Sequence, residues 1–283
     1  PDGYQPNNPG PTASAAADTR PTQTTHPGQH RKVLSAESRD TEAFAAIHEP
    51  PSTALANLYH LPELPPSGPA SLTGDIAHHL LRVLRVRVGD EIRIGDGRGG
   101  LATATVTATE KRVLSLQVGP SERRAPLTPA VTLAFAVPRP SRADWLFEHA
   151  TEVGVHRFQP LWTGRSRPQG IRADRYRKVC AAAAGQCARA WLPEVCEPLE
   201  LAAYLEAELP QRRILADASG AAISQAADGE DTVLLIGPEG GFQADERALA
   251  TARGFVATRF AGPILRTETA ALVGAAILLR DAR

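Results

Sequence analysis

Two glycine-rich turns near the end of the chain constrain its fold most strongly, because each leads from an apolar run into a helix-forming stretch. The turns are Leu234-Leu235-Ile236-Gly237-Pro238-Glu239-Gly240-Gly241-Phe242 and Ala261-Gly262-Pro263-Ile264-Leu265-Arg266-Thr267-Glu268-Thr269-Ala270. Turns of this kind at the carboxyl edge of a parallel sheet hold nucleotide-like ligands in α/β proteins. The pair therefore predicts an α/β protein and favours a cofactor-using enzyme.

Residues 126–283 alternate between strand-like and helix-like patterns. The expected strands are 131–136, 157–161, 213–217, 232–236 and 256–260, and the expected helices are 141–153, 172–190, 243–253 and 267–280. Such alternation predicts a mostly parallel sheet with helices on both faces.

Residues 55–125 are expected to form a small β-rich domain. Apolar and polar residues alternate in 91–94, 101–107 and 113–118, and glycine-rich turns separate these runs. The preceding stretch 76–86 has helical spacing, which places Arg82 and Arg85 on one face. A basic helix beside a small barrel suits RNA binding, although a purely structural barrel is the equal alternative.

The first 54 residues are proline-rich and contain almost no large apolar side chains before Val33, which predicts a disordered extension. No apolar run reaches the length of a membrane span. The three cysteines, Cys180, Cys187 and Cys196, match no zinc template and indicate free or buried thiols of a reduced cytoplasmic protein.

Charge is balanced in total, with 31 basic and 31 acidic residues, but it is unevenly distributed. Residues 139–189 contain ten basic and four acidic side chains, a net charge of +6. This segment predicts phosphate contacts, with a solvated helical face as the alternative.

The first turn has no Gly-Lys-Ser/Thr and no GxGxxG pattern, so its ligand is not expected to be held by phosphates. Its glycines allow backbone groups to approach a flat ring such as adenine, although a structural turn is the commoner meaning of such a motif. In the second turn, Thr267 or Thr269 can cap the last helix and Glu268 suits its positive end, while Arg266 can offer a cation to a substrate oxygen.

The two turns together resemble those of the 16S ribosomal RNA (uracil-N3)-methyltransferases of the SPOUT superfamily. Three further stretches agree in order and spacing: 79–90, the helix end Ala150-Thr151-Glu152-Val153-Gly154-Val155, and Gln186-Cys187-Ala188-Arg189 followed by Pro193-Glu194-Val195. The resemblance covers about residues 57–280. It implies a PUA-like β-barrel over 55–125, followed by a SPOUT-type parallel-sheet domain with a trefoil knot over 126–283.

The resemblance also implies S-adenosylmethionine as cofactor, a homodimer, and a uridine of the small subunit, uridine-1498 of 16S ribosomal RNA, as substrate. Cofactor-binding positions are expected at Leu215, Ile236, Gly237, Pro238, Gly240, Gly241, Gly262, Ile264, Leu265, Thr267 and Ala270. RNA-binding positions are expected at Arg82, Arg85, Arg87, Gln186 and Arg189, and no metal is suggested.

The chemistry requires uracil N3 to lose its proton as it attacks the sulfonium methyl group. We assign to Arg266 the stabilisation of charge on the carbonyl oxygens, while Glu239 or Glu268 accepts the proton or orients the base. The alternative is a non-catalytic RNA-binding or ribosome-assembly protein on the same fold. The chain departs from the family's pattern at several positions: Ile264 follows Pro263 without an intervening Arg, Gly185 replaces Glu, Ala188 replaces Gly, His149 replaces Lys, and Arg139-Pro140 replaces a Lys-Gly pair.

Overall fold

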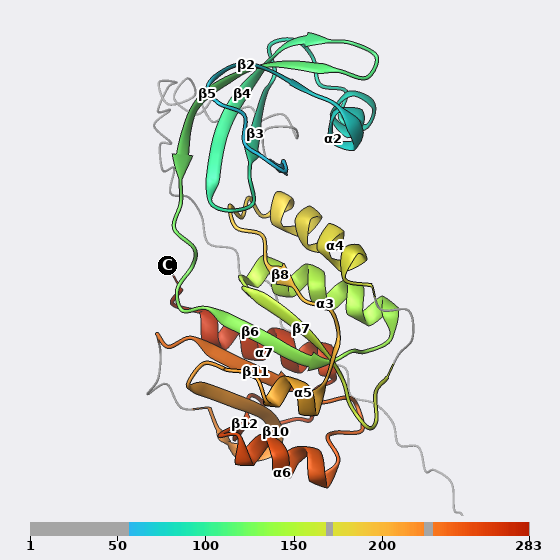
Figure 1. Cartoon of the computed structure of the whole chain (residues 1–283), viewed down its shortest axis with the longest axis vertical. Helices are drawn as coiled ribbons and strands as arrows, with labels where there is room; N and C mark the ends of the chain where they lie inside the picture. The colour runs from blue at the N-terminus through green and yellow to red at the C-terminus, as the bar shows by residue number, and fades with distance from the viewer. Residues whose placement is uncertain (1–56, 168–171, 224–228, 283) are drawn as a thin grey trace, which may run out of the picture. The chain divides into compact units, whose positions relative to one another are not determined.

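The computed structural model describes residues 57–167, 172–223 and 229–282, and the expected extension 1–54 lies outside these residues. The described chain forms two sheets, the first from the N-terminal part and the second from the C-terminal part (Figure 1). Each sheet has its own hydrophobic core.

The first sheet has five strands in the order β1-β3-β4-β5-β2. They are β1 (Leu58–His60), β2 (Gly68–Leu72), β3 (Glu91–Gly95), β4 (Gly100–Thr109) and β5 (Leu114–Arg123). All neighbours are antiparallel except β1 and β3. The alternation predicted for β3, β4 and β5 is confirmed, whereas the short strands β1 and β2 carry no such pattern and were not expected.

The helical spacing predicted over 76–86 is confirmed as far as Val83, but residues 84–86 are not helical. The chain forms the short helix α2 (Gly74–His78) and then the π-helical turn η1 (His79–Val83). Arg85 follows in the left-handed region with φ of 54°, which ends the helical path. Arg82 and Arg85 therefore do not share a helix face.

The second sheet has seven strands, with the path β12-β10-β11-β6-β7-β8 and with β9 also paired to β7. The strands are β6 (Val131–Ala136), β7 (Arg157–Trp162), β8 (Glu194–Val195), β9 (Leu199–Glu200), β10 (Arg212–Ala222), β11 (Thr232–Ile236) and β12 (Val256–Arg259). Every pairing is parallel, as the sequence predicted. β10 runs past its expected end because it pairs with β12 again after a bulge.

Five helices accompany this sheet: α3 (Pro140–Val153), α4 (Ala173–Gln186), α5 (Leu201–Leu205), α6 (Ala244–Ala252) and α7 (Thr267–Leu279). In β11, Leu234 and Ile236 belong to the core shared with α3, α4 and α7. The intervening Leu235 belongs to the core shared with α5 and α6. Successive strand residues point to opposite faces, so the sheet is covered on both faces, as predicted.

Helix α4 ends earlier than expected, and its last turn explains why. The N–H of Arg189 donates to the carbonyl of Ala184, and the N–H of Ala188 donates to the carbonyl of Gly185. These bonds form a Schellman motif with Ala188 at the left-handed position, where φ is 56°. Residues 187–190 therefore leave the helix.

Candidate functional site

An open cleft lies at the carboxyl ends of β10, β11 and β12. Its volume is about 190 Å³. Its wall is formed by residues 215–218 of β10, by the first Gly-Pro turn after β11 together with Arg247 of α6, and by the end of β12 with the second Gly-Pro turn that leads into α7. The two turns thus meet at one edge of the sheet.

Most of the expected cofactor-binding residues line this cleft. The lining contains Leu215, Ile236, Gly237, Pro238, Gly241, Ile264, Leu265, Thr267 and Ala270, and also Glu239. Gly240 and Gly262 belong to the same turns but do not line the cleft.

The first turn is folded around its glycines. The N–H of Gly241 donates to the carbonyl of Pro238 at 2.8 Å, and Gly241 has a φ of 71°. A Cβ on Gly237 would lie only 3.1 Å from the ring of Phe242. The glycines therefore bring the main chain to the cleft wall without intervening side chains, which suits a flat heteroaromatic ring.

Thr267 ties the two turns together. Its hydroxyl donates to the carbonyl of Gly237 at 3.0 Å. The expected capping of α7 by Thr267 or Thr269 is wrong, because the N-cap of α7 is Arg266 and no side chain caps it. The Thr267 hydroxyl is instead committed to the neighbouring turn, which fixes the spacing of the cleft walls.

Asp217 is a cleft residue that the sequence analysis did not single out. Its carboxylate accepts from the backbone N–H and the hydroxyl of Ser219, at 2.9 and 2.7 Å, and it pairs with Arg247. Burial acts to raise the pKa of Asp217, but the Ser219 groups and Arg247 outweigh it, so the pKa lies below its usual value. The cleft thus contains a carboxylate that is charged at neutral pH, and the Arg247 cation is already paired.

Arg142 of α3 connects both candidate carboxylates. Its Nη1 lies 3.2 Å from Oε1 of Glu239, and its Nε lies 3.6 Å from Oε1 of Glu268. The Oε2 atom of Glu268 is buried without a hydrogen-bond partner among the described residues. Arg266 itself is exposed at the start of α7 and does not line the cleft.

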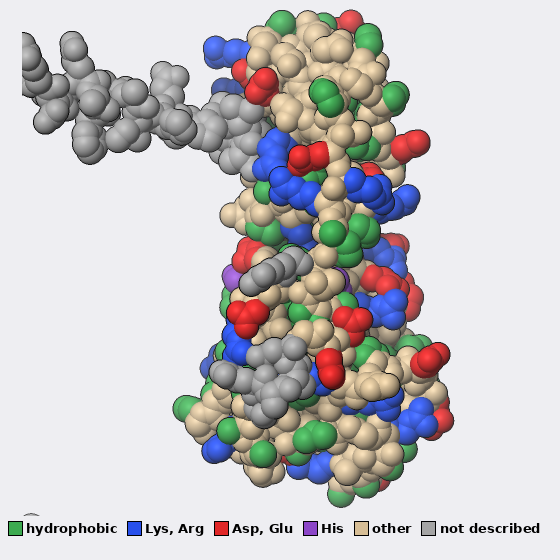
Figure 2. Space-filling model, turned by 90° about the vertical axis from the view of Figure 1, so that its left-hand side faces the viewer, with side chains coloured by type: hydrophobic (Ala, Val, Ile, Leu, Met, Phe, Trp, Pro, Cys, Tyr) green, Lys and Arg blue, Asp and Glu red, His purple; other side chains and the backbone are tan. Residues whose placement is uncertain are grey.

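Half of the ten basic side chains in the segment 139–189 form ion pairs with acidic neighbours. Ion pairs join Arg157 to Glu194, Arg167 to Glu200, Arg175 to Asp144, and Arg177 to both Asp174 and Glu197. Figure 2 shows blue and red side chains interspersed over much of one face. The paired arginines therefore fit the alternative of a solvated surface, and the prediction of phosphate contacts is confined to the other basic residues of the segment.

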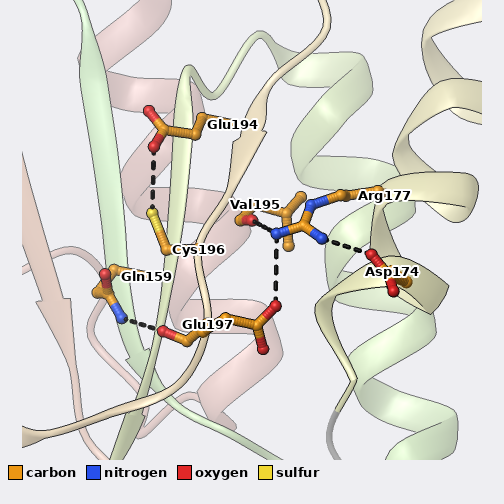
Figure 3. A network of polar contacts seen from close by, with 7 residues as sticks. All are labelled: Gln159, Asp174, Arg177, Glu194, Val195, Cys196 and Glu197. Carbon is orange, nitrogen blue, oxygen red and sulfur yellow. Dashed lines mark hydrogen bonds and ion pairs between the residues drawn. The ribbon is translucent and has the colours of Figure 1, made fainter.

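Arg177 serves mainly to attach α4 to the edge of the sheet (Figure 3). Its guanidinium donates to the carbonyl of Val195 at 2.9 Å and contacts the carboxylates of Asp174 and Glu197. The amide of Gln159 reaches the carbonyl of Glu197 from β7. These contacts give Arg177 a structural role.

The expected RNA-binding residues differ in their exposure to solvent: four are exposed and one is half-buried. Arg82, Arg85, Arg87 and Gln186 are exposed. Arg189 is half-buried and donates to the carbonyl of Thr151 at 2.9 Å, and burial lowers its pKa to about 10. Its guanidinium remains charged at neutral pH but is directed to backbone rather than to an open surface.

Sequence reasoning missed Asp217, Arg247 and Arg142 as site residues. Asp217 had a readable signal, because an acidic residue ends an apolar strand at the edge where ligands bind. Arg142 had none, because α3 is distant in sequence from both turns, and Arg247, although close to the first turn, had no signal for its pairing with Asp217 of β10.

The described residues offer neither a membrane-spanning helix nor a cluster of metal ligands. They contain no helix that is long and apolar enough to cross a membrane. They also contain no group of three or more His, Cys, Asp or Glu side chains that could hold a metal ion. The three cysteines are free, and burial raises the pKa of the Cys180 thiol to about 11.

Comparison with known proteins agrees with this arrangement. The family model of the RNA methyltransferase domain matches residues 125–279, and that of the RNA methyltransferase PUA domain matches residues 72–118. A ribosomal RNA small subunit methyltransferase E from Synechocystis is 33% identical over 276 residues, covering 89% of this chain and 91% of the relative. A protein of the same name from Mycobacterium bovis is 33% identical over 241 residues, covering 77% and 89%.

A solved structure is similar as well. The crystal structure of a ribosomal RNA small subunit methyltransferase E from Neisseria gonorrhoeae, bound to S-adenosyl methionine, has a TM-score of 0.73 and 27% sequence identity. The alignment covers 78% of this chain and 96% of that one.

A PUA domain followed by a parallel α/β domain with a glycine-walled cleft defines an RNA methyltransferase. More particularly, the chain belongs to the ribosomal RNA small subunit methyltransferase E family.

Proposed function

We propose that this protein transfers a methyl group from S-adenosylmethionine to N3 of a uridine in 16S ribosomal RNA, at uridine-1498. The observation that carries the proposal is the cleft between the two Gly-Pro turns, whose walls are joined by the bond from Thr267 to Gly237. The relative from Neisseria gonorrhoeae was crystallised with S-adenosyl methionine, which supports the choice of cofactor.

The residues of the cleft fit this cofactor. Backbone groups of Ile236–Gly241 and of Ile264 and Leu265 would hold the adenine. Asp217 offers a carboxylate to the hydroxyl or ammonium groups of the cofactor. Two arginines line the cleft among the described residues, Arg247 and Arg259. Arg247 is paired with the carboxylate of Asp217, and S-adenosylmethionine carries no phosphate that would need either cation.

The cofactor supplies an already activated methyl group, so the protein must orient the uracil and manage one proton. Arg266 stabilises negative charge on the uracil carbonyl oxygens as N3 is deprotonated. Glu239 or Glu268 accepts the proton, and Arg142 holds both carboxylates in place. The partly exposed Glu239 lines the cleft, whereas Glu268 lies beneath it.

RNA binding is assigned to the barrel and to the end of α4. Arg82, Arg85 and Arg87 are exposed cations suited to phosphates, and the exposed Gln186 amide suits a base edge. Arg189 contributes to RNA binding indirectly, because its hydrogen bond to the carbonyl of Thr151 orients the end of α4.

A homodimer, a trefoil knot and a cytoplasmic location complete the proposal. Helix α7 is apolar on nearly all sides, and Leu272, Val273 and Ile277 remain partly exposed on it. Ile264, at the cleft wall, is 87% exposed. An apolar helix beside an exposed isoleucine supports a second subunit packing there and completing the site. The proposed domains are 55–125 and 126–283, preceded by an extension over 1–54.

Mapping of methylated uridines in 16S ribosomal RNA from a deletion strain and its parent tests the proposal. The modification at N3 of uridine-1498 should be absent in the deletion strain and return with the wild-type gene. Arg266→Ala should abolish methyl transfer in vitro while calorimetry still detects binding of S-adenosylmethionine. Wild-type protein that binds RNA but not the cofactor would favour the non-catalytic alternative.

A further inference from the structure

A second cavity lies where strand β1 meets helix α4. Its volume is about 340 Å³, and we call it the seam cavity. Its lining includes Tyr59 and His60 of β1, Ile76 and His79 of α2 and η1, and Ala181 and Gln186 of α4. It shares no lining residue with the cofactor cleft.

Helix α4 and strand β1 approach closely beside the seam cavity because position 185 is glycine. A Cβ on Gly185 would lie 2.6 Å from the carbonyl oxygen of Leu58, which no packed side chain allows. The glycine, which replaces the glutamate of the family's pattern, therefore leaves the neighbouring space open while the backbones touch.

Three buried polar atoms of residues that line the seam cavity lack a well-formed hydrogen bond to any described residue, although the Asn57 side chain acts on the Tyr59 hydroxyl and the Arg189 backbone acts on the His60 ring. They are the hydroxyl of Tyr59 and both ring nitrogens of His60. Buried polar atoms are almost always paired, because an orphaned one loses its bonds to water without replacement. Three of them in one cavity indicate that a polar ligand completes it.

His60 is suited to a ligand with both donors and acceptors. Burial lowers the pKa of His60, although the nearby backbone of Arg189 opposes part of this effect. A neutral imidazole offers one N–H donor and one nitrogen acceptor. The exposed amide of Gln186, on the far side of the seam cavity, also offers both.

The aromatic rings and the lack of acidic side chains in the lining indicate which class of ligand the seam cavity suits. The rings of Tyr59 and His79 lie with centroids 6.4 Å apart and planes inclined by 51°. Nucleobases stack on such rings when RNA is recognised as a single strand. No acidic side chain is among the described residues that line the seam cavity. Arg82, an exposed cation in the same π-helical turn as His79, could meet a phosphate.

We propose that the seam cavity receives one unpaired base of the substrate RNA, stacked on the ring of His79 and bonded along its edge by Tyr59, His60 and Gln186. The inference rests on the proposed function, since it deepens how that RNA is recognised. The enzyme would then hold its substrate at two places, the target uridine at the cofactor cleft and a second nucleotide at the seam.

Tyr59→Phe tests the inference because it removes only the buried hydroxyl. Tyr204→Phe is a matched control: the Tyr204 hydroxyl is also buried and without a well-formed hydrogen bond, but Tyr204 belongs to α5 and lies in the core that α5 shares with α6. Melting temperatures are measured without RNA, and binding of unmodified 16S ribosomal RNA is measured by filter retention. Steady-state methyl transfer gives kcat and the KM for RNA.

Both variants should melt at or slightly above the wild-type temperature. Tyr59→Phe alone should weaken RNA binding and raise the KM for RNA by about tenfold, the size of one lost hydrogen bond, with kcat unchanged. His79→Ala should weaken RNA binding by about tenfold or more through lost stacking.

Unchanged RNA binding by Tyr59→Phe and His79→Ala would overturn the inference. A lower melting temperature for Tyr59→Phe would also overturn it, because the hydroxyl would then be partnered within the chain itself. RNA retention requires no turnover, so a wild-type protein that transfers no methyl group would refute the proposed function without affecting this measurement.

Discussion

The guanidinium of Arg142 lies 3.6 Å from the carboxylate of Glu268, whose side chain is only 10% exposed. The same guanidinium reaches Glu239 at 3.2 Å. One cation from α3 thus compensates two carboxylates, one at the start of α7 and one in the first Gly-Pro turn. Without it, two like charges would face each other with one of them buried, which raises the cost of keeping both ionised.

Arg142→Ala should therefore impair catalysis and stability together. We expect methyl transfer to fall by about 100-fold, the lower range for a misplaced general base. The free energy of unfolding should fall by about 2 kcal/mol, because a largely buried carboxylate loses its partner. Calorimetry should show nearly unchanged affinity for S-adenosylmethionine.

Two controls separate these effects. Adding Glu268→Gln to Arg142→Ala should restore most of the stability but none of the activity, since the buried charge is gone. Arg175→Ala breaks an exposed pair with Asp144 and should cost less than about 1 kcal/mol. Wild-type kinetics in Arg142→Ala would refute the positioning role.

Asp217 should contribute to cofactor affinity. Asp217→Asn keeps the shape of the side chain but removes its charge, and we expect about a tenfold rise in the Kd for S-adenosylmethionine, as for the loss of one charge-assisted hydrogen bond. Asp245→Asn, an exposed acid in the first turn of α6, is the charge-matched control and should leave the Kd unchanged. Equal Kd values for both variants and the wild type would remove Asp217 from the site.

The strands and helices near the cleft were predictable because their signals are local. Strands β6 and β11 begin and end where the apolar runs begin and end, at 131–136 and 232–236. The sequence of the two Gly-Pro turns likewise predicted the cleft and most of its lining. Each of these features depends on residues adjacent in sequence.

The remaining features depend on contacts between distant segments. Arg142 reaches Glu268 only because α3 and α7 pack on the same face of the sheet. The seam cavity exists because β1, too short to show a pattern, lies against α4. The spacing of apolar residues in 76–86 favoured a helix, but the structure has a π-helical turn at 79–83 and a left-handed Arg85 there.

Ala188→Gly should stabilise the protein. Ala188 occupies the left-handed position of the Schellman motif that ends α4, with φ of 56°. A Cβ in this conformation costs about 1 kcal/mol or more, which glycine avoids. We expect the free energy of unfolding to rise by about 0.5–1 kcal/mol, after the greater freedom of glycine in the unfolded chain is subtracted. Urea titration followed by circular dichroism measures it.

At the end of helix α3 the opposite substitution, glycine to alanine, can be tested at the same position of the motif. This helix ends in the same pattern of bonds, with Gly154 at the left-handed position and φ of 112°. Gly154→Ala should destabilise by about 1 kcal/mol or more. Ala248→Gly, within α6, should also destabilise, by about 1 kcal/mol, because there the alanine is helical. Destabilisation by Ala188→Gly would contradict the assigned strain.

His156 should make stability depend on pH. Its Nδ1 accepts from the N–H of Val131 at 3.3 Å, and its Nε2 lies 2.6 Å from the carbonyl of Leu127. Nδ1 must therefore be unprotonated in the folded state. Burial lowers the pKa of His156, and the Leu127 carbonyl opposes this only in part.

The direction in which stability changes with pH follows from how many protons the folded and unfolded states bind. Below about pH 6.5 the unfolded chain protonates this histidine while the folded protein does not, so stability falls as pH falls, until the folded pKa is reached. The slope should approach about 1.4 kcal/mol per pH unit for one histidine. Urea titrations from pH 7.5 to 5.5 should show a shallower slope for His156→Gln, whereas His78→Gln, which removes an exposed imidazole of α2, should keep the wild-type slope. Parallel curves for His156→Gln and the wild type would show that His156 binds its proton equally well in the folded and unfolded chain, which would contradict the hydrogen bond assigned from Val131 to Nδ1.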